Sequence, residues 1–200
     1  KLMYENKLIS EPKWKSWIIQ TTTPLFTPEQ CRQIIASGRA QKPQQAKVGM
    51  GKPEGGTNTN KRVTTISWIP FQEMGHMYQD LNNFIQKANE NHFGFGDIQV
   101  TEQAQFTEYP EGGFYDWHMD CDVNMAHEPP VRKISMTLLL NDPSEFEGGD
   151  LELLENKNKA TRLKQGHAII FASFLRHRVN PVTKGMRQSL VVWFGGKPFR

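Results

Sequence analysis

The second half of the chain constrains the fold most, because from about residue 98 onward it consists of short strand-like segments divided by turn residues. The segments are rich in β-branched and aromatic residues, while Gly, Pro, Asn and Asp gather between them. We expect seven strands, over residues 98–109, 114–121, 132–140, 151–154, 168–173, 177–182 and 187–194. Strands this short and this numerous favour a barrel or a sandwich.

Helical patterns are confined to the first half. Residues Thr27–Gln30 predict a helix start, with a threonine N-cap, a proline at the first helical position and a glutamine that completes a capping box. This helix is expected to end near Ser37, with Gly38 as the stop. Apolar residues at helical spacing predict a second helix over 72–91, and Val63–Ile69 predicts a strand between the two helices.

The chain is expected to form one domain over residues 1–200, because no linker divides it. Helices first and strands later predict an α+β fold, mainly β, in which residues 1–97 brace a β core over 98–200. Residues 41–62 are dominated by Gln, Lys, Pro, Gly, Thr and Asn, which predicts a long mobile loop. Such a loop is either a lid over a binding site or a surface insertion.

Composition excludes several classes of protein. The net charge of +3 comes from scattered Lys and Arg residues without a dense basic block, so no nucleic-acid partner is expected. No apolar run approaches the ~20 residues that cross a membrane, so no membrane partner is expected. The two cysteines do not form a disulfide framework, which favours a reducing, cytoplasmic location.

Three residues suggest a metal site. His118 and Asp120 are two positions apart on an expected strand, so their side chains share one face, and His177 begins a later strand. Two imidazoles and one carboxylate leave open positions on a metal, which suits non-haem iron(II) better than a closed structural zinc site. A lone His-X-Asp pair is more often two polar residues at a strand end than a metal site. The second histidine, His177, makes the metal site the better interpretation.

Arg187 opens the last expected strand and suggests an anion site. Alternation places Arg187, Ser189, Val191 and Trp193 on one face of that strand. A guanidinium can bind a carboxylate through two hydrogen bonds and keeps its charge when buried, and the Ser189 hydroxyl could support the same carboxylate. In isolation, a surface arginine on an exposed strand is the simpler interpretation.

Several motifs in order resemble a known family. The region from about 99 to 194 is similar to the double-stranded β-helix (jelly-roll) oxygenases that depend on iron(II) and 2-oxoglutarate, in their prolyl 4-hydroxylase-like branch. The motifs are Tyr109-Pro110-X-Gly112-Gly113-X-Tyr115-X-X-His118-X-Asp120, Arg132 through Leu140-Asn141-Asp142, Glu147-Gly148-Gly149-Asp150, Gly166-X-Ala168-X-X-Phe171, His177-X-Val179 and Arg187 through Trp193.

The resemblance implies a jelly-roll core and a role for each matching residue. His118, Asp120 and His177 would hold iron, and Arg187 would bind the far carboxylate of 2-oxoglutarate. The other implied pocket residues are Tyr109, Tyr115, Ser189 and Thr137 for the co-substrate, and Val179, Trp193 and Leu139 as lining. Leu139 stands where some relatives have a tyrosine.

Tyr115 requires a local irregularity. Tyr115 and His118 are three positions apart, so both can face inward only if the strand is irregular. We expect that irregularity near Gly112-Gly113.

The resemblance also implies the reaction. It is hydroxylation of a peptidyl proline with O2, releasing succinate and carbon dioxide, with ascorbate as an accessory reductant. The 41–62 loop would then cover a peptide or protein substrate, with Lys61 and Arg62 near its hinge. Alternatives are the same chemistry on a free amino acid or another small molecule, or a non-catalytic jelly-roll binding module. A nucleic-acid demethylase fits less well, because that branch has a second arginine where this chain has Trp193.

Overall fold

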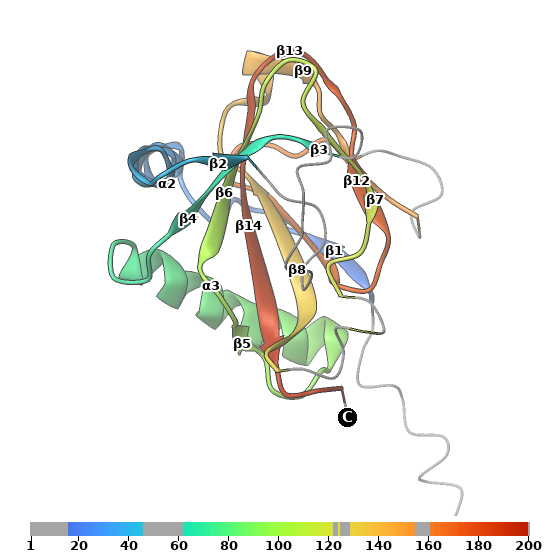
Figure 1. The fold of residues 1–200 in the computed structure, drawn as a ribbon. Coiled ribbons are helices and arrows are strands. Elements are labelled where there is room, and N and C mark those ends of the chain that lie inside the picture. Colours follow the sequence, from blue (N-terminus) through green and yellow to red (C-terminus); the bar gives the residue numbers. More distant parts are fainter. Residues whose placement is uncertain (1–15, 46–61, 122–123, 125–128, 155–160, 200) are drawn as a thin grey trace, which may run out of the picture.

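Figure 1 shows the computed structural model of the chain, which describes residues 16–45, 62–121, 124, 129–154 and 161–199. Two antiparallel sheets form a jelly-roll core, and two helices pack beside the larger sheet. The expected fold class, mainly β with helices bracing the β core, is confirmed. Within the described residues, no helix has both the length and the apolar character needed to cross a bilayer.

The larger sheet runs through the middle of the molecule in the order β1-β11-β8-β14-β6-β4-β2, and β5 pairs with the far end of β14. Its strands pair antiparallel throughout. They are β1 (Ile18–Gln20), β2 (Gln44–Gln45), β4 (Thr65–Ile69), β5 (Gln99–Val100), β6 (Ala104–Tyr109), β8 (Val131–Leu139), β11 (Ala168–Ala172) and β14 (Arg187–Gly196).

The smaller sheet has the order β10-β12-β7-β3. Its strands are β3 (Arg62–Val63), β7 (Phe114–His118), β10 (Leu151–Leu153) and β12 (His177–Val179). A separate antiparallel ribbon, at the top of Figure 1, pairs β9 (Phe146–Gly148) with β13 (Val182–Gly185), and a 3-10 turn over Pro143–Glu145 leads into it.

Both helices pack on the outer face of the larger sheet. Helix α2 spans Pro28–Ala40, and helix α3 spans Gly75–Ala88 and continues as a π-helical turn over Asn89–Phe93. One apolar cluster fills the space between helices and sheet, and a second lies between the two sheets. Along β14, Leu190, Val192 and Phe194 join the first cluster, and alternation turns the residues between them to the opposite face of the sheet.

The start of α2 follows the prediction and its end does not. The Thr27 side chain accepts a hydrogen bond from the Gln30 backbone, and the Gln30 side chain accepts one from the Thr27 backbone, so the capping box is present. The helix continues past Ser37 to Ala40, and Gly38 lies inside its last turn instead of stopping it. A Cβ at Gly38 would lie 2.4 Å from Cγ of Phe106 in β6, so the glycine allows a close approach of helix and sheet.

We expect Gly38→Ala to destabilise the protein by about 1–3 kcal/mol, because the added methyl overpacks against a buried ring. This cost should exceed the gain of about 1 kcal/mol in helix propensity. Urea unfolding followed by circular dichroism measures the change. Gln33→Ala, at an exposed position of the same helix, is the control and should stay within about 0.5 kcal/mol. Equal stability of the two variants would contradict this packing argument.

Four other expectations need correction. The strand expected over Val63–Ile69 is two strands, because the chain crosses at Thr64 from β3 in the smaller sheet to β4 in the larger one. The expected strands over 98–109 and 177–182 each divide in two, into β5 and β6 and into β12 and β13. Strand β2 interrupts the expected 41–62 loop; residues 46–61 lie outside the described residues, so the loop's role stays a prediction.

Candidate functional site

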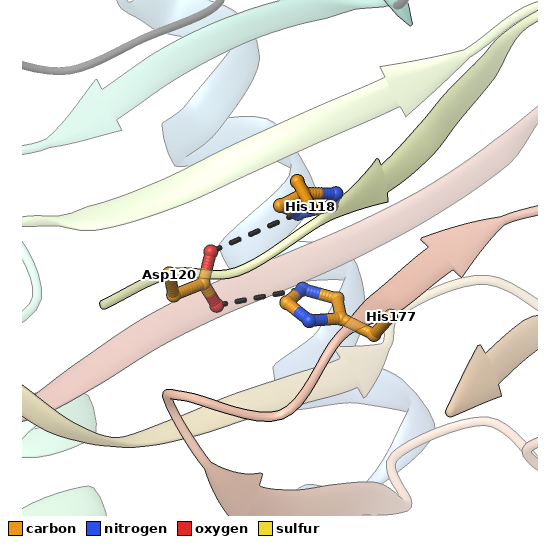
Figure 2. A group of neighbouring side chains, drawn as sticks. All are labelled: His118, Asp120 and His177. Atoms are coloured by element: carbon orange, nitrogen blue, oxygen red, sulfur yellow. Dashed lines mark ion pairs between the residues drawn. The ribbon is translucent and has the colours of Figure 1, made fainter. Parts of the chain in front are cut away.

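His118, Asp120 and His177 converge where the two inner strands of the smaller sheet, β7 and β12, meet at one end. His118 ends β7 and His177 begins β12, and the two are paired neighbours in the sheet. Nε2 of His118 lies 3.7 Å from Oδ1 of Asp120, and Nε2 of His177 lies 3.5 Å from Oδ2. Figure 2 shows the Asp120 carboxylate directed at both rings. One donor atom from each residue falls within 4.8 Å of the others, which is compact enough to suggest one shared cation.

Asp120 reaches this position by a bend and not by strand alternation. Strand β7 ends at His118, and the backbone amides of Asp120 and Cys121 both donate to the Ser173 carbonyl at 3.0 Å. The Ser135 hydroxyl donates to Oδ2 of Asp120 at 2.7 Å, and Oγ of Ser173 lies 2.9 Å from Oγ of Ser135. Ser135 and Ser173 were not among the expected site residues. Ser135 shares the inward face of β8 with Thr137, so alternation alone could have identified it.

Both imidazoles are held in the form that a metal needs. Nδ1 of His118 lies 2.7 Å from the Asp116 carbonyl, and Nδ1 of His177 lies 3.0 Å from the Leu175 carbonyl. A carbonyl only accepts hydrogen bonds, so each Nδ1 carries the hydrogen and donates it. Nε2 of each ring is therefore left with a lone pair on the side of Asp120, and the carbonyls fix the orientation of the rings.

The electrostatics favour a carboxylate beside a neutral imidazole. Burial by itself raises the pKa of Asp120, but His177, His118, Arg132 and the Ser135 hydrogen bond together hold that pKa below its ordinary value. Burial, with His177 nearby, lowers the pKa of His118 to about 3. At neutral pH, Asp120 is then charged and His118 is neutral, which are the protonation states of metal ligands.

Tyr115 faces inward, as the resemblance implies, but the irregularity lies elsewhere. The Tyr115 ring stacks on the His118 ring with centroids 3.5 Å apart. The register of β7 against β12 shifts between Tyr115 and His118, so the irregularity follows Tyr115 instead of preceding it at Gly112-Gly113. Burial raises the pKa of Tyr115 to about 12, so its hydroxyl stays protonated at neutral pH.

Arg187 lies buried at the start of β14, with its side chain 3% exposed. Its Nη1 donates to Oγ of Ser189 at 3.0 Å, and its guanidinium carbon lies 5.3 Å from the centre of the Tyr109 ring. Burial lowers the pKa of Arg187, yet arginine remains charged in proteins. In the described part of the chain, no carboxylate forms an ion pair with Arg187. A buried cation of this kind suits an anionic ligand.

The turn between β9 and β10 closes over the stem of Arg187. Gly149 has a φ of +67°, and a Cβ there would lie 2.9 Å from Cδ of Arg187 and 3.0 Å from Cγ2 of Val182. The Gly-Gly-Asp motif thus leaves room for the arginine to pass beneath the turn. Asp150, the next residue, contributes a favourable charge toward Arg187.

The two parts of the site are linked through two tyrosines. Tyr109 pairs with Arg187 in the larger sheet and is close enough to Tyr115 to affect its pKa. Tyr115 in turn stacks on His118. The Arg187 guanidinium and the cluster of His118, Asp120 and His177 therefore lie in the same interior between the two sheets.

The remaining expected pocket residues also lie buried in the barrel. Thr137 pairs with Val191, Leu139 pairs with Ser189, and Leu139 belongs to the apolar cluster between the sheets. Val179 lies in the same cluster, opposite Tyr115. Within the described residues, Trp193 Nε1 is a buried side-chain polar atom without a hydrogen-bond partner. The structure brings none of these four into the ligand cluster itself.

Arg62 lies on the same side as Tyr115, while Lys61 falls outside the described residues. Arg62 is 9% exposed, its Nε donates to Oγ1 of Thr64 at 2.9 Å, and its guanidinium carbon lies 4.3 Å from the centre of the Tyr115 ring. Arg62 was expected near the hinge of the 41–62 loop, and it lies in β3, which pairs with β7 in the smaller sheet.

A third arginine, Arg132, lies close enough to Asp120 to affect its pKa, although the sequence predicted it only as the start of a strand. Arg132 contacts the Trp193 ring, with its guanidinium carbon 3.7 Å from the ring centre. It also pairs with Glu102 through two hydrogen bonds of 2.6 and 2.7 Å. Its charge contributes to the lowered pKa of Asp120.

Comparisons with known proteins agree with this geometry. Residues 104–195 match the family model described as the 2OG-Fe(II) oxygenase superfamily. A PKHD-type hydroxylase of Colwellia psychrerythraea is 34% identical over 148 residues, which cover 72% of this chain and 65% of that protein. The chain therefore spans less than two thirds of the length of that curated relative.

Solved structures share the fold. A Pseudomonas putida prolyl-4-hydroxylase superposes with a TM-score of 0.67 at 21% identity, covering 90% of this chain and 92% of that one. A Trichoplax adhaerens prolyl hydroxylase, solved with a hypoxia inducible factor peptide fragment, gives a TM-score of 0.65 at 19% identity, covering 90% and 83%. At these identities the similarity concerns the fold.

Proposed function

Since residues 104–195 match the family model of the 2OG-Fe(II) oxygenase superfamily, we propose that the chain is an oxygenase of this kind and hydroxylates a peptidyl proline with iron(II), 2-oxoglutarate and O2. Succinate and carbon dioxide are the co-products. The observation that carries the proposal is the shared interior of a two-histidine, one-carboxylate cluster and a buried arginine without an ion-pair partner among the described residues.

The donor set fits iron(II). His118, Asp120 and His177 would bind it through two Nε2 atoms and one carboxylate oxygen, which leaves positions for co-substrate and O2. Bound iron, with its co-substrate and O2, supplies the oxidising power for insertion of oxygen into a C–H bond. The protein groups position that chemistry: Ser135 orients the carboxylate, and two backbone carbonyls orient the rings.

Arg187 would bind the far carboxylate of 2-oxoglutarate. Its guanidinium can form two parallel hydrogen bonds, and in a dry pocket each is stronger than in water. The Ser189 hydroxyl accepts from Arg187 and keeps its own hydrogen free to donate to the same carboxylate. Tyr109 and Thr137 would line the co-substrate, with Val179, Leu139 and Trp193 excluding water around it.

The proline substrate is supported by likeness alone. The structural neighbours include prolyl hydroxylases, one of them with a bound peptide fragment. Arg62 of β3 lies beside Tyr115 of β7, and Lys61 precedes it in the sequence. Both would contact the peptide. We also propose ascorbate as an accessory reductant. We also propose a reducing, cytoplasmic location, because two cysteines in a chain of 200 residues do not resemble a disulfide framework.

The decisive experiment incubates the chain with iron(II), 2-oxoglutarate, O2 and a panel of proline-containing peptides. Mass spectrometry should find one added oxygen on proline, with an equal amount of succinate. Matched peptides with alanine in place of proline, and free proline itself, are the controls. Oxidation of free proline alone would replace the peptide substrate by a small molecule. Absence of both oxidation and succinate across the panel would favour a binding module.

A further inference from the structure

Strand β7 has one residue more than β12 between two paired positions. His118 pairs with His177, and Tyr115 pairs with Val179. Three steps along β7 therefore match two steps along β12, which is the pattern of a β-bulge. The bulge lies in the strand that ends at the first histidine of the site.

The bulge has two consequences for His118. In a regular strand, residues three apart face opposite sides, so Tyr115 and His118 could not both face the interior. The extra residue turns both inward, where their rings stack. The carbonyl that accepts the hydrogen of His118 Nδ1 also belongs to the bulge, since it is that of Asp116.

On the outer face of the sheet, one aromatic ring, that of Trp117, covers the bulge. Trp117 is half-buried, and the guanidinium carbon of Arg178 lies 4.9 Å from its ring centre and that of Arg176 lies 5.9 Å away. Arg178 is the residue of β12 between the two paired positions, so it stands opposite the bulge.

A neighbouring strand fixes Arg178 in turn. Glu152 of β10 pairs with Arg178 in the sheet and binds it at 2.7 Å, and the Asn180 amide donates to the same carboxylate at 2.8 Å. Hydrogen bonding to Arg178 and Asn180 lowers the pKa of Glu152, which keeps the pair charged at neutral pH. The row Glu152–Arg178–Trp117 thus crosses three strands over the bulge.

We propose that Trp117 is a positioning residue that maintains the bulge and so holds His118 as the Nδ1–H tautomer with Nε2 available to a metal. Arg178 contributes indirectly, because its guanidinium lies over the Trp117 ring and holds that ring in place. The proposal rests on the proposed metal site, but its structural part concerns the metal-free chain. A side chain that only filled surface area would affect stability without affecting the state of the His118 ring.

The test compares Trp117→Ala, Trp117→Phe and Arg178→Gln with the unchanged chain. Phe71→Ala is the matched control, because Phe71 is an exposed ring in a turn outside the site and contacts the Tyr78 ring at a tilt. Long-range nitrogen-15 NMR of the metal-free proteins reports the His118 tautomer, and titration with cobalt(II) reports metal affinity. Thermal unfolding shows that each variant is folded.

In Trp117→Ala we expect loss of the single Nδ1–H signature of His118 and cobalt(II) affinity weakened about tenfold, the size typical for residues that orient a metal ligand. Arg178→Gln should change both readouts in the same direction by less, while Trp117→Phe and Phe71→Ala should remain within about twofold of the unchanged chain. An unaltered tautomer in folded Trp117→Ala and Arg178→Gln would overturn the proposal. Absence of cobalt(II) binding in the unsubstituted chain would overturn the proposed function, and loss of the His118 tautomer in Trp117→Ala would then still support the role of the bulge.

Discussion

Replacing Asp120 with alanine is expected to reduce iron-dependent succinate formation by more than about 100-fold, beyond the 10–100-fold that loss of a ligand-orienting group costs. The variant removes the single carboxylate of the cluster and leaves the two imidazoles without their third partner. Two ligands can neither balance the charge of the metal nor fix its open positions. Measurement of succinate at saturating 2-oxoglutarate, over a range of iron(II) concentrations, gives the loss.

The Asp120→Ala fold should survive, because the neighbouring contacts are largely backbone ones. The amide of residue 120 would still donate to Ser173. Glu111→Ala is the control, since Glu111 is an exposed carboxylate just before β7, and it should keep full activity. Full activity of folded Asp120→Ala would show that the cluster does not hold the catalytic metal.

Arg187→Ala should raise the 2-oxoglutarate concentration needed for half-maximal activity at least about 30-fold. Loss of one partner from a buried, hydrogen-bonded charge pair costs about 2–5 kcal/mol, and 2 kcal/mol corresponds to about 30-fold. The requirement for iron(II) should change far less, because Arg187 contacts Ser189 and Tyr109 and none of the metal cluster. Steady-state titrations of 2-oxoglutarate and of iron(II) separate the two requirements.

Arg187→Lys provides a graded comparison. Lysine keeps the charge and loses the forked geometry, so its 2-oxoglutarate requirement should fall between those of arginine and alanine. If both variants weakened iron(II) and 2-oxoglutarate binding equally, Arg187 would act on the whole interior and not as a carboxylate clamp.

Local rules predicted much of the fold and the identity of the candidate ligands. The capping box at Thr27 and the alternation of β14 depend on neighbouring residues, and both are present as expected. The ligand residues were recognisable because their types and order are unusual. The proposed roles at the site, and the single domain over residues 1–200, remain predictions.

Other features depend on pairing between distant segments, which sequence patterns do not contain. The bulge in β7 exists only relative to β12, and the bend that places Asp120 depends on a carbonyl 53 positions away, at Ser173. A glycine such as Gly38 is typical of a helix end. Here it is needed inside the helix, because its missing side chain leaves room for the ring of Phe106 in the sheet. In each case a partner remote in sequence overrides the local signal.

The shared carbonyl of Ser173 has a further consequence. It accepts the amides of Asp120 and Cys121, and it lies four residues before His177, so one short segment ties the aspartate bend to the approach of the second histidine. A fluctuation that releases the bend also frees that approach, which makes the two ligands open and close as one cooperative unit. The site should therefore exchange between a complete set of ligands and one that lacks both Asp120 and His177, without dwelling in a form that has lost only one of these two.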